Sequence, residues 1–228
     1  VRSIRTFFVP LAVMMIVRGT LQPLVQAGIA RGAESATRAL AVYGVTWGLV
    51  LNVVAPLQLL HNTSLVYAPS RDHPSWRRVF WFCIATGGVM TGMLLLLGLT
   101  PLGYVVFERI LGVSREIATD ASQAVLAFSL LPLFWGARES YWGVMMRRHR
   151  TRGIGIGKLV NIGAVALAMV VLFVLVRDVV RIPPSVVGAL SLSFGELVET
   201  VLVIRLAVRE DESAGADDSA PPPGSDAS

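Results

Sequence analysis

Six apolar stretches, each long enough to cross a lipid bilayer, account for most of this 228-residue chain. They cover the ranges Thr6–Ala30, Leu40–Tyr67, Val79–Gly98, Ala121–Met146, Ile154–Val176 and Ser185–Leu206. About 20 residues of α-helix cross the hydrocarbon core, where every backbone polar group needs a partner within the chain. The pattern therefore predicts an all-α, polytopic membrane protein with six transmembrane helices.

The breaks between these stretches alternate between strongly basic and mixed charge. The strongly basic set contains Arg2, Arg5, Arg71, Arg77, Arg78, Arg147, Arg148, Arg150, Arg152 and Arg209. Lys and Arg near span ends are retained in the cytoplasm, so we expect both termini there and a multi-pass protein of the plasma or inner membrane. The net charge of +5 then indicates contact with anionic lipid headgroups. Nucleic acid is not expected as a partner, because the basic runs lack interleaved aromatic residues.

The chain divides into two parts by composition. Residues 1–208 form the predicted six-helix domain, and residues 209–228 are rich in Glu, Asp, Ser, Ala and Pro. Such a segment buries little apolar area, so it is predicted to be a disordered, acidic cytoplasmic tail. The half-polar break Leu99–Asp120 is expected to hold a short amphipathic helix at the membrane interface. Pro10, Pro23, Pro56 and Pro132 fall inside the first, second and fourth spans, where proline frees a backbone carbonyl. Two interpretations stay open, namely broken helices that build a mid-membrane site and kinks that only aid packing.

A polar stripe marks the first span. Arg18, Gln22 and Gln26 follow at steps of four residues and therefore share one helical face. An ionisable group at the bilayer centre costs about 3 kcal/mol or more, so this face is expected to point into the bundle. Two interpretations stay open, namely a cavity lining and a structural pair with an acid on another helix.

Glu196 and Glu199 lie midway along the sixth span, three residues apart on one face. Neighbouring carboxylates raise each other's affinity for protons, so the pair is a candidate proton or cation site. Pairing with Arg18 or Arg138 is the alternative.

Further charged and polar residues occur in the fourth, fifth and second spans. Arg138 and the adjacent Glu139 point about 100° apart on a helix and are expected to serve different partners. Lys158, followed by Asn161, is either a cavity residue or a side chain that reaches the cytoplasmic surface. Asn52 is a further candidate for the cavity. For His61, in the same span as Asn52, one interpretation is a group that titrates near neutral pH, and the favoured one is a hydrogen-bonded histidine at a helix end.

No catalytic or metal-binding motif is visible. The run Gly153–Lys158 resembles a phosphate-binding loop, but Arg152 stands where its first glycine belongs and Leu159 where Ser or Thr belongs. Cys83 is the only cysteine, so a cysteine metal cluster is excluded. We therefore expect no enzyme activity, cofactor or metal.

Several short segments resemble the progressive ankylosis protein family over about residues 5–206. They are Phe8–Leu11, Ala27–Ala30, Ala41–Gly44, Pro56, Asn62, Leu65–Tyr67, Ser70–Asp72, Pro132, Met146–Arg152, Leu190–Leu192, Gly195 and Leu197–Val198. The resemblance implies the MATE-like superfamily of multidrug and oligosaccharide-lipid exporters, whose members usually have two six-helix lobes and work by alternating access. This chain supplies one such lobe, so a homodimer or a second lobe is implied.

The resemblance also implies a range of functions. Ankylosis-type members are associated with export of pyrophosphate and related polyanions. Arg18 and Gln22 stand where the family pattern has acidic residues, which favours an anionic solute, a different coupling ion or a lobe that has lost transport. Arg18, Arg138 and Lys158 would attract the anion, and Glu139, Glu196 and Glu199 would be ion-coupling sites. The alternatives are a lipid-linked saccharide flippase and a non-transporting scaffold or regulatory subunit.

Overall fold

The computed structural model is a bundle of long helices. It describes residues 2–68, 70–71, 73–148, 151–175 and 182–218, without the side chains of residues 2–11, 13–15, 17–18, 151–152, 175 and 210–218. Its elements are α1 (Arg2–Gly32), α2 (Ala36–Val54), η1 (Ala55–Leu59), α3 (Leu60–Tyr67), α4 (Trp76–Leu99), α5 (Pro101–Val105), η2 (Val106–Ile110), α6 (Arg115–Phe128), α7 (Leu131–Arg147), α8 (Thr151–Leu175) and α9 (Pro184–Asp218). The described residues are helical or irregular and form no strand, which confirms the all-α class.

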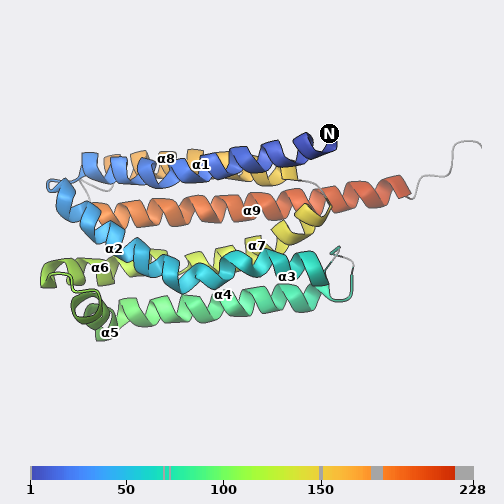
Figure 1. Cartoon of the computed structure of the whole chain (residues 1–228). Coiled ribbons are helices and arrows are strands. Elements are labelled where there is room, and N and C mark those ends of the chain that lie inside the picture. Colours follow the sequence, from blue (N-terminus) through green and yellow to red (C-terminus); the bar gives the residue numbers. More distant parts are fainter. Residues whose placement is uncertain (1, 69, 72, 149–150, 176–181, 219–228) are drawn as a thin grey trace, which may run out of the picture.

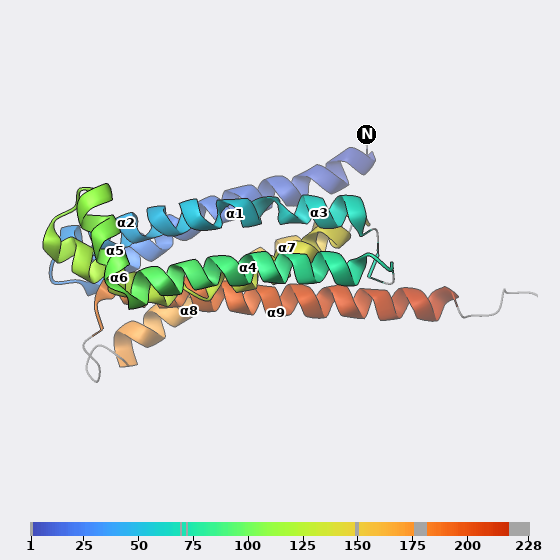
Figure 2. The same cartoon turned by 90° about the horizontal axis from the view of Figure 1, so that it is seen from below.

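The chain runs back and forth along the bundle, so that α1 begins and α9 ends at the same end (Figure 1). Viewed at 90° to this, α9 runs the length of the bundle and continues beyond α4 (Figure 2). Five segments are long and apolar enough to cross a membrane: Ala36–Tyr67, Trp76–Leu99, Arg115–Arg147, Gly153–Val174 and Pro184–Arg209. The sixth expected span, Thr6–Ala30, lies within α1, most of whose first half has no described side chains. The first span stays a prediction, and so does the location of both termini on the cytoplasmic side of the membrane.

Two of the passes are interrupted near proline residues. Pro56 stands at the start of η1, a 3-10 turn that separates α2 from α3. Pro132 stands at the start of α7, after a break at Ser129 and Leu130. The first turn of a helix tolerates proline because its N–H groups have no partner within the helix. The expected proline breaks are therefore present in the second and fourth passes, whereas α1 continues through Pro23.

Helix α7 packs very closely against α3 and α4. A methyl group built on Gly136 would meet the backbone carbonyl of Cys83, and one on Gly143 would meet the carbonyl of His61. Glycine lets helix backbones approach in a membrane, where the contact is stabilised by van der Waals packing. These contacts place α7 inside the bundle.

The corner between α4 and α6 contains the expected short helix, as α5 followed by the π-helical turn η2. Phe107 is fully buried, whereas Ile110 is 73% exposed. Gly112 ends the turn with a φ of 68°, a left-handed conformation that favours glycine. The contact of this corner with a membrane interface stays a prediction.

Candidate functional site, a buried cluster of charges

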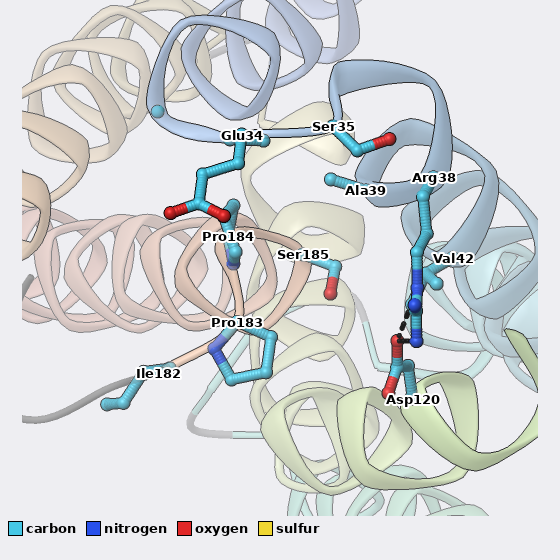
Figure 3. Close-up of a pocket in the computed structure, with 12 residues that line it drawn as sticks. Glu34, Ser35, Arg38, Ala39, Val42, Asp120, Ile182, Pro183, Pro184 and Ser185 are labelled. Atoms are coloured by element: carbon cyan, nitrogen blue, oxygen red, sulfur yellow. Dashed lines mark hydrogen bonds and ion pairs between the residues drawn. The ribbon is translucent and has the colours of Figure 1, made fainter. Parts of the chain in front are cut away.

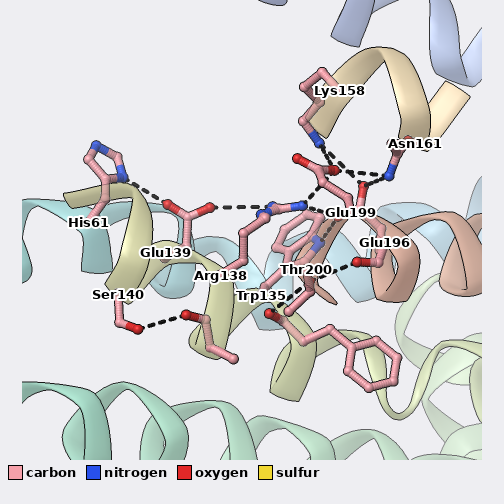
Figure 4. A network of polar contacts seen from close by, with 12 residues as sticks. His61, Trp135, Arg138, Glu139, Ser140, Lys158, Asn161, Glu196, Glu199 and Thr200 are labelled. Carbon is pink, nitrogen blue, oxygen red and sulfur yellow. Dashed lines mark hydrogen bonds and ion pairs between the residues drawn. The ribbon is translucent and has the colours of Figure 1, made fainter. Parts of the chain in front are cut away.

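Five charged side chains from three helices meet inside the bundle (Figure 4). They are Arg138 and Glu139 on α7, Lys158 on α8, and Glu196 and Glu199 on α9. Their side chains are between 0% and 5% exposed. We call this set the charge cluster. All five were candidates from the sequence, and the fold brings them into contact.

Two cations and two carboxylates form the inner part of the cluster. Arg138 donates through Nη1 to Oε2 of Glu196 and, at 3.1 Å, to Oε2 of Glu199. Lys158 Nζ lies 2.6 Å from Oε2 of Glu199 and 3.6 Å from Oε1 of Glu196. Lys158 is 4% exposed, so the interpretation that it reaches the cytoplasmic surface is wrong. The contact with both carboxylates holds it inside.

Neutral side chains complete this inner part. Asn161 Nδ2 donates to Oε1 of Glu196 at 3.2 Å and to Oε2 of Glu199 at 3.0 Å. Trp135 Nε1 donates to Oε2 of Glu196 at 2.7 Å. The ring centroid of Trp142 lies 4.7 Å from Cζ of Arg138, within the range of a cation–π contact. The carboxylates are therefore held by hydrogen bonds as well as by charge.

Glu139 contacts a different set of groups. Its Oε2 lies 2.9 Å from Nδ1 of His61 on α3, and its Oε1 accepts a 3.3 Å hydrogen bond from Nη2 of Arg138. His61 is 27% exposed and lies in the first turn of α3. The predictions of separate partners for Arg138 and Glu139, and of a hydrogen-bonded histidine at a helix end, are confirmed.

A small cavity adjoins the cluster. Its volume is about 70 Å³, and its lining consists of Leu21, Gln22, Trp47, Trp135, Arg138, Lys158, Leu192 and Glu196. A polar cavity of this size has room for a few water molecules. Gln22 Oε1 also accepts a 3.0 Å hydrogen bond from the hydroxyl of Tyr43. The cavity thus connects the polar face of α1 to the charges of α7, α8 and α9.

A larger pocket of about 750 Å³ opens at the end of the bundle where α1 turns into α2 (Figure 3). Its lining consists of Gly32, Ala33, Glu34, Ser35, Arg38, Ala39, Val42, Asp120, Ile182, Pro183, Pro184 and Ser185. Arg38 Nη2 donates to Oδ2 of Asp120 at 2.8 Å, and Nη1 donates to Glu116 at 3.0 Å. These contacts tie α2 to α6 at the mouth of the pocket. We call it the end pocket.

The comparison with known families agrees with this membrane architecture. A model of the progressive ankylosis protein family matches residues 2–228. The chain belongs to this family. It is a family of membrane proteins linked to transport, so the resemblance seen in the short segments is confirmed over nearly the whole chain. No solved structure matches the chain. Membership of the wider MATE-like superfamily stays a prediction.

Three candidate residues from the sequence are not seen in the charge cluster of this ankylosis family member. Two lie elsewhere in the fold, and the side chain of the third is not described. Gln26 is exposed on α1. Asn52 is exposed on α2, where Nδ2 donates to the carbonyl of Gly48 at 2.8 Å. The side chain of Arg18 lies outside the described residues. The fold unites the other candidates: Gln22, Arg138, Glu139, Lys158, Asn161, Glu196 and Glu199.

Sequence reasoning gave no role in the site to Trp135, Trp142 and Tyr43. A signal existed for the two tryptophans, which lie about one turn to each side of Arg138. Tyr43 had none, because its partner Gln22 lies 21 residues away. His61 was recognised as a polar residue of its span, but its partner Glu139 lies 78 residues away and was not.

Four buried polar atoms of the charge cluster and its neutral neighbours have no hydrogen-bond partner among the described residues. They are Nε of Arg138, Nε1 of Trp142, Oδ1 of Asn161 and Oε1 of Glu199. Buried polar groups are normally paired, so these atoms offer two donors and two acceptors to water or to a solute. No group of three His, Cys, Asp or Glu side chains in the described part of the chain is suited to a metal ion.

Proposed function

We propose that this chain is one lobe of a transporter that moves an anionic small molecule across the membrane by alternating access. The observation that carries the proposal is the charge cluster, in which five ionisable side chains are buried among three membrane-spanning helices. Each such group costs about 3 kcal/mol or more at the bilayer centre, even before its pairing is considered. Intramembrane charges of this kind are typical of solute and ion pathways.

Stability alone does not account for this arrangement. A buried ion pair gains little over well-packed apolar side chains, because desolvation offsets most of the attraction. A bundle that only needed to be stable would fill this space with apolar residues. The cluster also adjoins a polar cavity and retains unpartnered atoms, which a purely structural network would avoid.

The proposed solute is anionic because Arg138 and Lys158 both border the cavity. In this conformation the two cations are held by Glu196 and Glu199. An anion entering the cavity would replace the carboxylates as the partner of Arg138 or Lys158, and the released carboxylates would become the coupling sites. Arginine and lysine bind phosphate oxygens well, so polyanions such as pyrophosphate are the first candidates.

The packing on each side of the cavity supports an alternating-access cycle. Between the cavity and the end pocket, Val25, Ile29 and Tyr43 are almost completely buried. Toward the other end of the bundle, Met145 and Val203 belong to a second apolar cluster and are also buried. The conformation is thus closed on both sides of the cavity, as an occluded intermediate of such a cycle would be.

The proposal includes a second lobe, supplied by another copy of the chain. Native mass spectrometry of the protein in bilayer discs tests this part, and the expected mass is that of a dimer. A stable monomer would contradict the homodimer and direct the search to a separate partner lobe.

Uptake of labelled pyrophosphate by vesicles containing the purified protein tests the transport function. We expect uptake above that of empty vesicles and at least a tenfold loss in the double variant Lys158→Met/Glu199→Gln, which removes one charge of each sign. Arg205→Gln is the matched control, because Arg205 is exposed on α9 and makes no ion pair with described residues. No uptake of pyrophosphate, phosphate or citrate by the wild-type protein would count against the proposal.

A non-transporting scaffold is the second candidate, favoured by the pairing of both cations with carboxylates of the same chain. The double variant Lys158→Met/Glu199→Gln separates the two functions when its stability is measured beside its uptake, because it removes one charge of each sign and leaves Arg138 opposite Glu196. If the pair serves only the fold, the folded double variant keeps the uptake of the wild type, whereas a solute site loses it.

A further inference from the structure

Among the side chains that the structure describes, the charges of the cluster do not balance without a proton. Arg138 and Lys158 are matched by Glu196 and Glu199, so this inner group of four is neutral when all are ionised. Glu139 is a third carboxylate and adds one negative charge. An uncompensated charge in the membrane interior is strongly disfavoured, so a further positive charge or a bound proton is required.

The additional carboxylate is the one that contacts a histidine. His61 Nδ1 lies 2.9 Å from Oε2 of Glu139, within hydrogen-bond distance. Histidine is the side chain whose charge commonly changes between about pH 5 and 8. A proton on either His61 or Glu139 makes the pair neutral and thereby neutralises the whole cluster.

We propose that His61 and Glu139 share one exchangeable proton, which makes this pair a proton-coupling site of the transporter in addition to the carboxylates of Glu196 and Glu199. The coupling of this proton to transport rests on the proposed function, whereas the binding of the proton by the pair does not. The sequence suggested Glu139 as an ion-coupling residue together with Glu196 and Glu199, and the structure adds His61 as the partner of Glu139. Its position also suits the task, because His61 is 27% exposed and Glu139 is 5% exposed. The pair therefore connects the surface of the bundle to its buried charges.

The other groups around the pair do not supply the missing charge. From α7, Arg138 contacts Glu139 but is already opposed by Glu196 and Glu199, and Arg147 donates to the carbonyl of Leu65. From α4, the thiol of Cys83 is buried beside Glu139 and carries no positive charge. Among the described side chains, His61 is thus the group that can neutralise Glu139.

Proton and solute binding should promote each other at this site. An anion that binds Arg138 or Lys158 adds negative charge to the cluster, which favours uptake of a proton by His61 or Glu139. Linkage makes the effect reciprocal, so a protonated pair binds the anion more tightly. The expected stoichiometry is at least one proton moved with each anion.

Infrared difference spectroscopy on the purified protein in bilayers tests proton binding without any transport. When the pH is varied, we expect imidazole or carboxyl bands that are lost in both His61→Gln and Glu139→Gln. His73→Gln is the control, because His73 is exposed in the loop before α4 and should leave these bands in place. Identical spectra for the wild type and His61→Gln would overturn the proton site.

Vesicles loaded with a pH-sensitive dye then test the coupling. Pyrophosphate uptake should change the internal pH in the wild type and in His73→Gln, and the protons moved per pyrophosphate should fall at least fivefold in Glu139→Gln. Uptake without proton movement would overturn the coupling while leaving transport intact. Infrared bands without uptake would instead reject the proposed function and leave the proton site standing.

Discussion

Lys158 on α8 and Glu199 on α9 are joined by a 2.6 Å contact between Nζ and Oε2, although they lie 41 residues apart in the chain. Glu199 is completely buried and Lys158 nearly so. The pair therefore fixes the register of two neighbouring membrane helices by a contact that water does not weaken. Arg138 reaches the same carboxylate oxygen from α7, so a single oxygen connects three helices.

The first prediction concerns this pair. Lys158→Met should lower the free energy of unfolding by on the order of 3–5 kcal/mol, because it leaves a buried carboxylate with one cation fewer. The double variant Lys158→Met/Glu199→Gln should be less destabilised than Lys158→Met, since the remaining Arg138 and Glu196 balance each other. Chemical unfolding in detergent micelles measures both. Losses that simply add would show that the two side chains act independently.

The second prediction concerns Trp135, whose Nε1 donates to Glu196 at 2.7 Å. Trp135→Phe keeps an aromatic ring but removes the donor, and should cost about 1.5–3 kcal/mol because the acceptor is charged. Trp81→Phe is the matched control, since Trp81 is 58% exposed on α4. Equal changes in melting temperature for both variants would contradict a role for this hydrogen bond.

The third prediction concerns the close contact of α7 with α4. Gly136→Ala places a methyl group against the backbone carbonyl of Cys83, which cannot move away as a flexible side chain would. The expected loss of stability is about 1–3 kcal/mol. The methyl group added by Gly88→Ala on α4 meets nothing within 4 Å. This variant should leave stability unchanged or raise it by up to about 1 kcal/mol, because alanine favours the helix more than glycine does. Thermal unfolding of the two variants decides between these expectations.

The fourth prediction concerns pH and the corner between α4 and α6, outside the five apolar segments. A hydrogen bond from Tyr104, together with contact to Arg115, lowers the pKa of Glu108 below its ordinary value. Glu108 therefore stabilises the fold at a pH above its ordinary pKa, and this contribution is lost as the pH falls through the lowered value. Tyr104→Phe should raise the pKa of Glu108 toward normal.

Carboxyl NMR of labelled glutamate, as a function of pH, measures this change. The control is Tyr67→Phe, because Tyr67 is 64% exposed at the end of α3. A Glu108 titration that is the same in Tyr104→Phe and the wild type would show that the hydroxyl has no part in the shift.

Much of this protein follows from its sequence alone. Apolar runs of about 20 residues have one stable form in hydrocarbon, so the all-helical architecture is determined locally. Charged residues are costly there, and Arg138, Glu196 and Glu199 were therefore recognisable as buried groups before any contact was known, whereas Lys158 was left open. The prolines at 56 and 132 likewise marked the two interrupted passes, because proline removes a backbone donor.

Only the tertiary structure decided which of these groups meet. Spacing in the sequence relates residues on one helix, but the pairing of Lys158 with Glu199 depends on how two helices are rotated against each other. The same reason explains why Gly44 and Gly48 on α2 meet nothing within 4 Å, whereas Gly136 on α7 forms a close contact. It also explains why Asn52 lies on the surface and His61 beside Glu139, since helix rotation is set by packing across the whole bundle.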